Sequence, residues 1–455
     1  MMNPPFSINR RSALARMGAG MGTLGLFNAL QSQANLTPHF KPRAKRVIHL
    51  FMNGGPFGPD FMDPKPALKK YEGQRPEGTD LRTERPTGGL LNAPYEYTQH
   101  GQSGLPISSL LPHTAKFADD ICALRSVHTD NPNHGPALLL MNNGTMTPKV
   151  PSMGAWCSYG LGTENTNLPA YIVLCPGRPV RFSILWNSAF LPSKHQGVYI
   201  NHSKITPKEM IPWLRNTKLD TATQRKQLDL ISALNREHLA TQGGTDNALQ
   251  GRIEAMETAY RMQFAATDAF DIEKEPKSIR ESYGKGHFAN GCLIARRLSE
   301  RGVRFIQVYY GNGQPWDTHK NHNKTTPTLA RNIDQPMAAL LGDLKARGLL
   351  EDTLIMWGGE FGRTPVSEIG RNGRDHNPHG FLMWMAGGGV KGGMAYGESD
   401  PFGFKAVHNR MHIHDLHATM LYLLGFDHER LTYRLSGRDF RLTNVSGEVA
   451  REILA

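Results

Sequence analysis

Short apolar runs alternate with longer segments of helical periodicity along most of the chain, and this alternation constrains the fold more than any other feature. The runs have the length of buried strands, and several are followed by glycines or prolines, which favour loops. They lie at residues 46–53, 121–126, 170–174, 303–310, 353–357 and 381–386. Helical segments lie at residues 135–142, 326–347 and 413–424. This order predicts an α/β fold with a mostly parallel sheet that helices cover on both faces.

Residues 205–300 differ from the rest of the chain, because they combine periodic apolar positions with few glycines and many charged residues. The periodicity predicts helices near residues 223–240, 246–270 and 287–301. No linker composition bounds this stretch. We therefore expect a helical insertion within one domain that spans residues 35–455.

The N-terminus has the three-part layout of a signal peptide. Arg10 and Arg11 precede an apolar run at residues 17–30, and Ser32-Gln33-Ala34 offers small residues for cleavage. The run is too short to span a membrane, and the paired arginines resemble the twin-arginine variant. An N-terminal amphipathic helix is the alternative. We predict that residues 1–34 direct twin-arginine export, that the protein is periplasmic or secreted, and that no transmembrane segment follows.

The net charge of +12 raises nucleic acid as a partner. The basic residues are scattered, however, and form no basic helix or aromatic-interleaved patch. We interpret the charge as a solvated basic surface and expect no nucleic-acid partner. The four cysteines form no C-x-x-C pair, which argues against zinc-ribbon and thioredoxin folds. The sequence is compatible with up to two disulfides and equally with free buried thiols.

Acidic residues and histidines follow the predicted strands, where loops at the carboxyl ends of a parallel sheet form sites. Carboxylates neutralise a divalent ion, and neutral imidazoles suit zinc, manganese or iron. Two such ions about 4 Å apart would clamp a phosphoryl or sulfuryl group. The candidates are Asp60, Asn131, Asn133, His134, Asp317, His319, His322, Glu360, Asp375, His376 and His379. The sequence leaves open whether His376 or His379 is the nearer ligand.

Three other features have two interpretations each. Arg363 is suited to bind an anion through two N–H groups, or to form an ion pair. His412 and His414 alternate along the chain, so either one of them enters the site or His414-Asp415 caps the helix that opens there. The run Gly387-Gly388-Gly389 lacks the lysine of a phosphate loop and is interpreted as a turn.

Several blocks together resemble a bacterial family, domain of unknown function 1501, which is sulfatase-like and abundant in planctomycetes. The resemblance covers nearly all of the mature chain and implies an alkaline-phosphatase-like fold. The blocks are Asn53-Gly54-Gly55-Pro56 with Asp60, Asp63-Pro64-Lys65-Pro66, Trp316-Asp317-Thr318-His319, Gly359-Glu360-Phe361-Gly362-Arg363-Thr364-Pro365, Gly373-Arg374-Asp375-His376, and His414-Asp415-Leu416-His417-Ala418-Thr419.

Residues 134–144 are similar in spacing to the sulfatase motif C/S-x-P-S-R-x-x-x-L/M-T-G, whose first residue becomes the formylglycine nucleophile. Here His134 stands at the nucleophile position, Leu138 replaces the arginine and Asn143 replaces the threonine. Formylglycine forms only from cysteine or serine, so this departure argues against ordinary sulfatase chemistry.

The resemblance also implies a division of metal ligands between two ions. Asp60 and Glu360 would hold one ion, and the other would be held by Asp317, His319 or His322, and His376 or His379. Phe361 stands where the superfamily often has a further histidine, which makes the two-ion site less complete. The implied cofactor is a divalent metal, with zinc, manganese, iron and calcium as candidates.

Two functions follow. The first is an exported metal-dependent hydrolase of phosphate or sulfate esters, acting on a sulfated or phosphorylated small molecule or polysaccharide, with His134 and Arg363 as catalytic candidates. The second is a catalytically inactive protein that keeps the fold and binds or assembles envelope partners. The nucleophile position of His134 motivates the second function.

Overall fold

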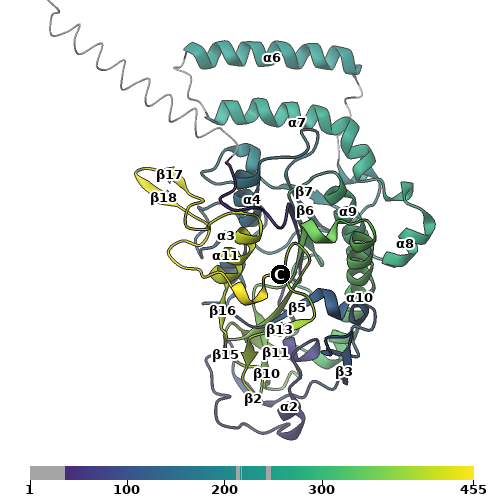
Figure 1. Ribbon diagram of the computed structural model, residues 1–455, viewed down its shortest axis with the longest axis vertical. Coiled ribbons are helices and arrows are strands. Elements are labelled where there is room, and N and C mark those ends of the chain that lie inside the picture. Colours follow the sequence, from purple (N-terminus) through teal and green to yellow (C-terminus); the bar gives the residue numbers. More distant parts are fainter. Residues whose placement is uncertain (1–35, 212–215, 217, 242–246) are drawn as a thin grey trace, which may run out of the picture. The chain divides into compact units, whose positions relative to one another are not determined.

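A nine-stranded sheet runs through the centre of the computed structural model (Figure 1), which describes residues 36–211, 216, 218–241 and 247–455. The predicted signal peptide lies outside the described residues. The strand order is β13-β5-β12-β9-β1-β8-β6-β7, and β16 pairs with β5. These strands are β1 (Arg46–Phe51), β5 (Ile121–His128), β6 (Tyr171–Cys175), β7 (Val198–Asn201), β8 (Phe305–Tyr309), β9 (Thr353–Gly358), β12 (Phe381–Ala386), β13 (Met394–Tyr396) and β16 (Met411–His412).

All six strands that the apolar runs predicted belong to this sheet. Strand β1 pairs in parallel with β8 and β9, and β6 pairs in parallel with β7 and β8. Only β12 runs antiparallel to its two neighbours, β5 and β9. Every residue of β1, β8 and β9 is buried, as expected for strands covered on both faces. The predicted α/β fold with a mostly parallel sheet is therefore confirmed.

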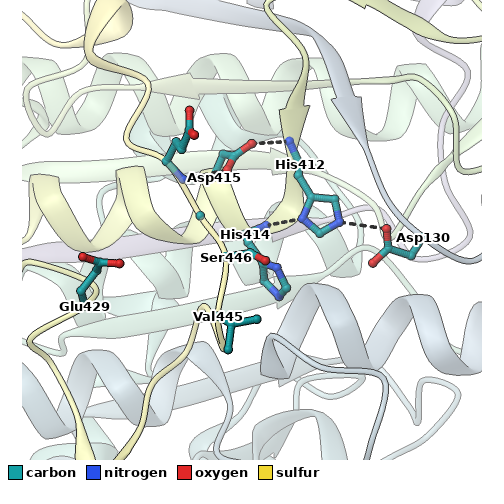
Figure 2. A pocket seen from close by; sticks show the side chains of 9 residues that line it. Asp130, His412, His414, Asp415, Glu429, Val445 and Ser446 are labelled. Carbon is teal, nitrogen blue, oxygen red and sulfur yellow. Dashed lines mark hydrogen bonds and ion pairs between the residues drawn. The ribbon is translucent and has the colours of Figure 1, made fainter.

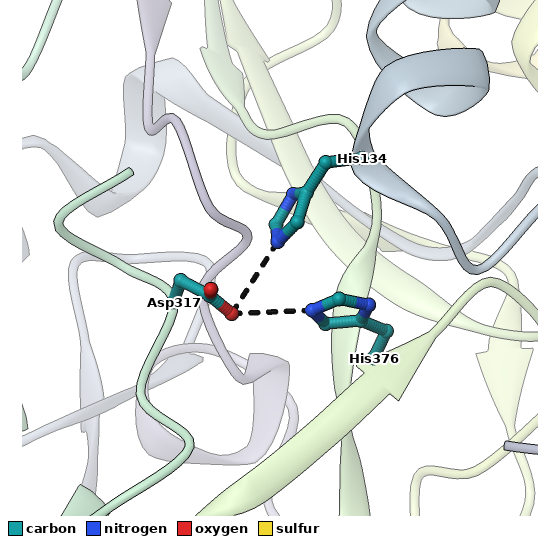
Figure 3. Close-up of side chains that lie close together, drawn as sticks. All are labelled: His134, Asp317 and His376. Carbon is teal, nitrogen blue, oxygen red and sulfur yellow. Dashed lines mark hydrogen bonds and ion pairs between the residues drawn. The ribbon is translucent and has the colours of Figure 1, made fainter. Parts of the chain in front are cut away.

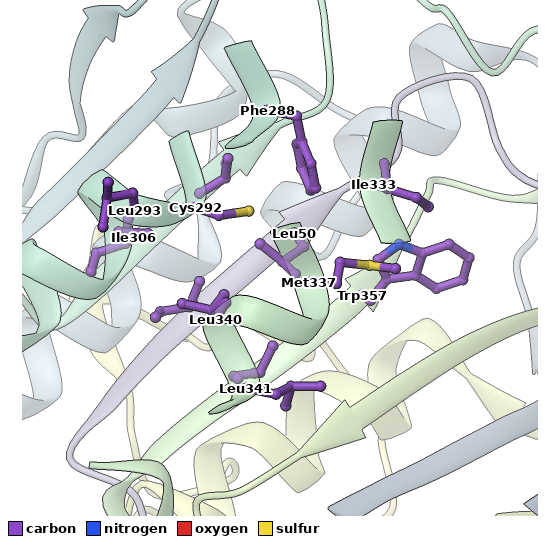
Figure 4. Packing of buried hydrophobic residues seen from close by; sticks show 14 of the residues in the cluster. Leu50, Phe288, Cys292, Leu293, Ile306, Ile333, Met337, Leu340, Leu341 and Trp357 are labelled. Carbon is purple, nitrogen blue, oxygen red and sulfur yellow. The ribbon is translucent and has the colours of Figure 1, made fainter. Parts of the chain in front are cut away.

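Helices α9 (His287–Glu300) and α10 (His322–Ala346) lie on one side of the strands, and α3 (His134–Asn143), α4 (Met153–Leu161) and α11 (Ile413–Leu423) lie on the other (Figure 1). Apolar side chains of α9 and α10 meet those of β1, β8 and β9 in the main core (Figure 4). Phe288, Leu340 and Trp357 are among the buried residues of this contact. Pro38–Ala455 form one compact unit.

Helix α10 begins at His322, four residues before the predicted start. Pro327 is of a residue type common in a first helical turn, but here it lies inside the helix. Inside the helix, Pro327 cannot bond to the carbonyl of Asn323. The hydroxyl of Tyr95 donates to that carbonyl instead, at 3.2 Å. This tertiary contact satisfies the group that Pro327 leaves free.

The segment around Asp375 and His376 is a strand and not the predicted loop. Strand β11 (Arg374–Asn377) pairs antiparallel with β10 (Gly362–Glu368), which also pairs with β2 (Thr87–Leu90). Both β10 and β11 are rich in buried polar side chains. Since neither has the apolar alternation of an ordinary strand, the prediction was wrong for a physical reason: tertiary hydrogen bonds and not apolar burial stabilise the pair.

Residues 205–300 contain the expected helices α6 (Thr221–Thr241), α7 (Asn247–Ala269) and α9, together with the shorter α5 (Pro207–Met210) and α8 (Lys277–Tyr283). Helix α9 belongs to the core, whereas no residue of α6 is buried. The four cysteines are buried free thiols. Among the described residues, no helix combines the length and apolar character that crossing a membrane requires.

Candidate metal centre

The carboxyl ends of β5 and β8, together with strand β11, bring distant side chains together. His134 is the first residue of α3, which follows β5 and is capped by the Asn133 side chain accepting from Gly135 N at 3.2 Å. Asp317 and His319 lie between β8 and α10, and His376 lies in β11. Because β5, β8 and β9 point the same way, their carboxyl ends meet at one edge of the sheet.

One carboxylate oxygen is the centre of the cluster. The Oδ1 atom of Asp317 lies 2.9 Å from Nε2 of His319, 3.2 Å from Nε2 of His376 and 3.4 Å from Nε2 of His134. The Nε2 atoms of His319 and His376 are 3.0 Å apart. Figure 3 shows His134 and His376 approaching Asp317 from different elements. Three imidazoles thus direct the same ring nitrogen toward one oxygen atom.

Each imidazole has an acceptor at its other nitrogen. Nδ1 of His134 lies 2.7 Å from Oε1 of Glu360, and Nδ1 of His319 contacts Oε1 of Glu368. Nδ1 of His376 lies 2.6 Å from the carbonyl oxygen of Pro132. A carbonyl oxygen only accepts, so Nδ1 of His376 carries hydrogen. This arrangement, Nδ1 bonded to an acceptor and Nε2 directed inward, is the usual support of metal-binding histidines.

Burial lowers the pKa of His376 to about 3, so the ring is neutral and Nε2 carries a lone pair. Burial opposes ionisation of Asp317, but hydrogen bonds from the surrounding histidines hold its pKa well below its usual range. Burial alone would lower the pKa of His134. Its hydrogen bonds to Asp317 and Glu360 outweigh this and raise the pKa above its ordinary value. The cluster therefore holds anionic oxygen and a neutral nitrogen that favour a cation.

The three closest ligand atoms have the spacing of a metal site. Ligands bonded to one ion at about 2.1 Å lie on the order of 3.0–3.4 Å apart in octahedral or tetrahedral geometry. The separations among Asp317, His319 and His376 are 2.9, 3.0 and 3.2 Å. The Nε2 atoms of His319 and His376 face each other, and the Nδ1 atom of each ring faces an acceptor. Two facing lone pairs repel, so either a proton or a metal ion must lie between the two Nε2 atoms. The donor set fits a divalent ion of the zinc, manganese or iron type.

Arg363 is fully occupied by protein contacts. Its side chain is 0% exposed, and Nη2 lies 2.6 Å from Oδ1 of Asp317. The guanidinium also donates to the carbonyl oxygens of Gly54, Gly55 and Arg374. It therefore positions the carboxylate of Asp317 and offers no free N–H pair to an outside anion.

Glu360 is held by the backbone as well as by His134. Its two oxygens accept from the backbone N–H of Gly54 at 3.1 and 3.2 Å. Gly54 has a φ of +113°, and a Cβ there would lie 2.5 Å from the backbone nitrogen of Asp317. Glycine is thus required where the loop after β1 passes against the loop that carries Asp317.

Asp60 and His322 form a separate buried pair. Nε2 of His322 lies 2.7 Å from Oδ2 of Asp60, and Nδ1 lies 2.6 Å from the hydroxyl of Thr318. Burial lowers the pKa of His322 despite the neighbouring carboxylate. Oδ1 of Asp60 is buried and has no hydrogen-bond partner among the described residues.

His379 lies apart from Asp317. Its Nε2 contacts the carbonyl oxygen of Arg82 at 3.1 Å, and its ring meets the ring of Phe404. Among the described residues, two groups of three candidate ligand atoms lie within 4.8 Å of one another: His134 with Asp317 and His376, and His319 with Asp375 and His376. The geometry therefore separates His376 from His379, which the sequence left open.

Sequence reasoning did not single out the partners of the histidines. Glu368 at the end of β10 holds His319, and Glu84 lies 2.7 Å from Nδ1 of His376. Phe361 lies between two imidazoles, with ring centroids 4.7 Å from those of His134 and His376. No local pattern indicates the roles of Glu368 and Glu84, because they depend on contacts between segments far apart in the chain.

A hollow with a volume of about 690 Å³ lies beside the start of α11, away from Asp317 (Figure 2). Nε2 of His412 lies 3.2 Å from Oδ1 of Asp130, and Nδ1 of His412 accepts from the backbone N–H of His414. Oδ2 of Asp415 accepts from the backbone N–H of His412 at 2.7 Å. These bonds make His412, and not the predicted His414, the cap of α11, and Asp415 completes a capping box.

The chain belongs to the family described as "Protein of unknown function (DUF1501)", whose model matches residues 44–454. This confirms the family that the sequence blocks resembled. No curated protein matches the chain at a significant level.

Three solved structures are similar to this chain at low sequence identity. Ps i-CgsB has 10% sequence identity and a TM-score of 0.37, over 85% of this chain and 72% of that chain. PsFucS1 sulfatase from Pseudoalteromonas sp. has 13% identity and a TM-score of 0.33, over 91% and 72%. TAB5 alkaline phosphatase has 12% identity and a TM-score of 0.32, over 76% and 92%.

Proposed function

We propose that the protein is a metal-dependent hydrolase of phosphate or sulfate esters, with its reaction centre at Asp317. The observation that carries this proposal is the convergence of three imidazole Nε2 atoms on one carboxylate oxygen, with an acceptor at each opposite ring nitrogen. The ligands of the ion are Asp317, His319 and His376. Asp60 and His322 are proposed as ligands of a second ion, and Glu360 supports His134.

A divalent ion at this position supplies a Lewis acid that stabilises developing negative charge and activates a water molecule. The chain supplies positioning and a proton. Asp317 is held by Arg363, and its side chain is 24% exposed, so an ester can approach it. The raised pKa of His134 favours the protonated ring. From Nε2, His134 donates a proton to the alcohol oxygen that leaves as the bond to phosphorus or sulfur breaks. It regains a proton from the water that forms the new bond.

Two residues have roles that differ from those expected of a sulfatase. His134 acts as a proton donor and not as a covalent nucleophile, since Glu360 holds its Nδ1 and the raised pKa favours the protonated ring, which has no free lone pair. Arg363 acts as a positioning residue, because its donors are used by Asp317 and backbone carbonyls.

The proposal also includes the class of substrate and the location of the protein. The twin arginines at Arg10 and Arg11 support export to the periplasm or beyond. We propose a sulfated or phosphorylated small molecule or polysaccharide as the substrate. The second candidate function is a non-catalytic envelope protein that keeps the metal as a structural element. The complete use of Arg363 inside the protein favours it, because sites that bind such anions usually present a free bidentate donor.

The test uses the full protein purified after export from its native host. Turnover of nitrophenyl phosphate, nitrophenyl sulfate and a sulfated polysaccharide is measured before chelation, after chelation and after addition of zinc, manganese, iron or calcium. The hydrolase proposal predicts turnover that chelation removes and one ion restores. It also predicts that Asp317→Ala and His134→Gln are inactive while His379→Gln keeps activity.

Two results separate the candidates. Bound metal without turnover of any of these esters, in protein that is folded, contradicts the hydrolase and supports the non-catalytic function. Turnover that is unchanged in His134→Gln contradicts the role of His134 as proton donor.

A further inference from the structure

No residue of helix α6 is fully buried, and the structure describes the helix without a gap. It runs beside α7 (Figure 1) and is tied to it by specific contacts. The guanidinium of Arg225 donates to both carboxylate oxygens of Glu257, at 2.9 and 2.6 Å. The hydroxyl of Tyr260 donates to the carbonyl of Thr221 at 3.3 Å. These bonds fix which face of α6 is directed toward α7.

The face toward α7 is half-buried and the opposite face is not. The half-buried side chains of α6 are those of Gln224, Arg225, Leu228, Ser232, Asn235 and Leu239. At about 100° per residue they lie on one side of the helix. Leu230 and Leu234, one turn apart, lie on the other side and are 61% and 57% exposed. An exposed pair of leucines on a helix face is typical of a contact surface.

Two unpaired charges flank these leucines on the same exposed face. Lys226 lies one turn before Leu230, and Glu237 lies about one turn after Leu234. Neither side chain has an ion pair or hydrogen bond with any described residue, in contrast to Arg225 and Asp229 nearby, which pair at 2.8 Å. The exposed stripe therefore consists, in order along the helix, of one cation (Lys226), two leucines (Leu230 and Leu234) and one anion (Glu237).

We propose that this stripe is a self-complementary surface through which a second copy of the chain docks, with the two α6 helices antiparallel. An antiparallel two-fold pairing centred on residue 232 places Leu230 opposite Leu234 of the partner subunit. The same pairing places Lys226 within one residue, about 1.5 Å along the axis, of the position opposite Glu237 of the partner subunit. Both charges find opposite partners, and both leucines are removed from water.

The order of the charges selects this orientation. In a parallel pair, Lys226 would face Lys226 of the partner subunit, and Glu237 would face Glu237 of the partner subunit. Like charges would then repel each other at both ends of the pair. A helix of this length forms only a narrow contact, well below the area of about 1,200–2,000 Å² that stable complexes bury. We therefore expect a dissociable dimer whose population depends on protein concentration.

The test is sedimentation velocity of the full exported protein over about 1 to 100 µM, a range in which weak dimers form. The expected result is a shift from monomer to dimer with rising concentration. The doubly substituted Leu230→Ser/Leu234→Ser protein should stay monomeric. Ile369→Ser, which removes an equally exposed apolar side chain elsewhere, should behave as the wild type.

Charge reversal tests the antiparallel register itself. Lys226→Glu and Glu237→Lys each place like charges at both ends of the pair, so each variant alone should dimerise about tenfold more weakly. An equimolar mixture of the two variants restores two attractive pairs in a heterodimer. The mixture should therefore dimerise as well as the wild type.

Three results would overturn the proposal. The first is a wild-type protein that stays monomeric over the whole concentration range. The second is a dimer that survives the double serine substitution. The third is a mixture of the two charge variants that dimerises no better than either one alone.

Discussion

The candidate metal centre and the antiparallel helices α6 and α7, which we call the hairpin, place charged side chains in opposite environments. At the centre, Glu360 and Arg363 are fully buried, and each is held by several donors or acceptors from distant segments. In the hairpin, Arg225 bonds to Glu257, but Lys226 and Glu237 remain exposed without partners among the described residues. Charge in the centre is constrained by the whole fold, whereas charge on α6 is constrained by one neighbouring helix.

This difference between buried and exposed charges predicts where single substitutions should have large effects. A buried charge is stable only when hydrogen bonds and ion pairs compensate it. Removal of one partner therefore leaves the remaining buried charge uncompensated. An exposed charge keeps its water when its partner is removed. The same substitution type should therefore have unequal consequences in the two regions.

The largest expected effect is on metal affinity at the centre. His376→Ala removes a ligand atom that lies 3.2 Å from Asp317, whereas His379→Ala removes a ring that contacts Arg82. We expect His376→Ala to weaken metal binding by more than about 100-fold, beyond the effect of losing a supporting residue. His379→Ala should stay within about threefold of the wild type, since its ring lies outside the centre. Competition with a fluorescent chelator measures both affinities, and equal losses in the two variants would contradict the proposed ligand set.

The second effect compares a leucine in the core with a leucine on the hairpin. Leu340 on α10 is 0% exposed and Leu230 on α6 is 61% exposed. Leu340→Ala should lower the free energy of unfolding by about 2–5 kcal/mol through lost burial and a cavity. Leu230→Ala should change it by less than about 0.5 kcal/mol. Urea unfolding at a concentration where the protein is monomeric compares the two variants, and similar losses would contradict the difference between the regions.

The core and the hairpin also differ in how they could be predicted from sequence. Apolar runs identified β1, β8 and β9, because fully buried strands need continuous apolar residues. The periodicity of α6 and α7 identified both helices, because helical periodicity is local. Strands β10 and β11 escaped prediction, since buried side chains such as Arg363 and His376 interrupt any apolar pattern.

The centre was predictable in its residue types but not in its bonds. Strand ends indicated that Asp317, His319 and His376 would lie near one another. Which of His376 and His379 approaches Asp317 depends on the pairing of β11 with β10, which no local signal revealed. Glu368 was missed for the same reason.

The third effect concerns that missed residue. Glu368→Gln weakens the acceptor at Nδ1 of His319 and removes the ion pairs at 3.5 Å with Arg85 and Arg371. We expect a 10- to 100-fold loss of metal affinity, the usual effect of losing a supporting carboxylate. Glu398→Gln, an exposed change of the same kind, is the control and should keep the wild-type affinity. Isothermal titration measures both, and an unchanged affinity in Glu368→Gln would show that this carboxylate does not support the site.

The smallest effect is expected at the ion pair between α6 and α7. Arg225→Met removes a partly exposed pair with Glu257 and a stacking contact with the Tyr260 ring. We expect a loss of about 0.5–1 kcal/mol in the free energy of unfolding, as for other exposed pairs. Thermal unfolding monitored by circular dichroism checks this value. A loss of several kcal/mol would mean that the hairpin is as tightly coupled as the buried centre.

The most direct test of the central claim is the metal content of the full protein, purified from its native host and dialysed against metal-free buffer, compared with that of Asp317→Ala. Elemental analysis should find at least one equivalent of zinc, manganese, iron or calcium in the wild type. It should find at least one equivalent less in the folded variant, because Asp317 joins all three imidazoles. A wild type without metal, or a variant that keeps its full content, would contradict the assignment of a metal centre at Asp317.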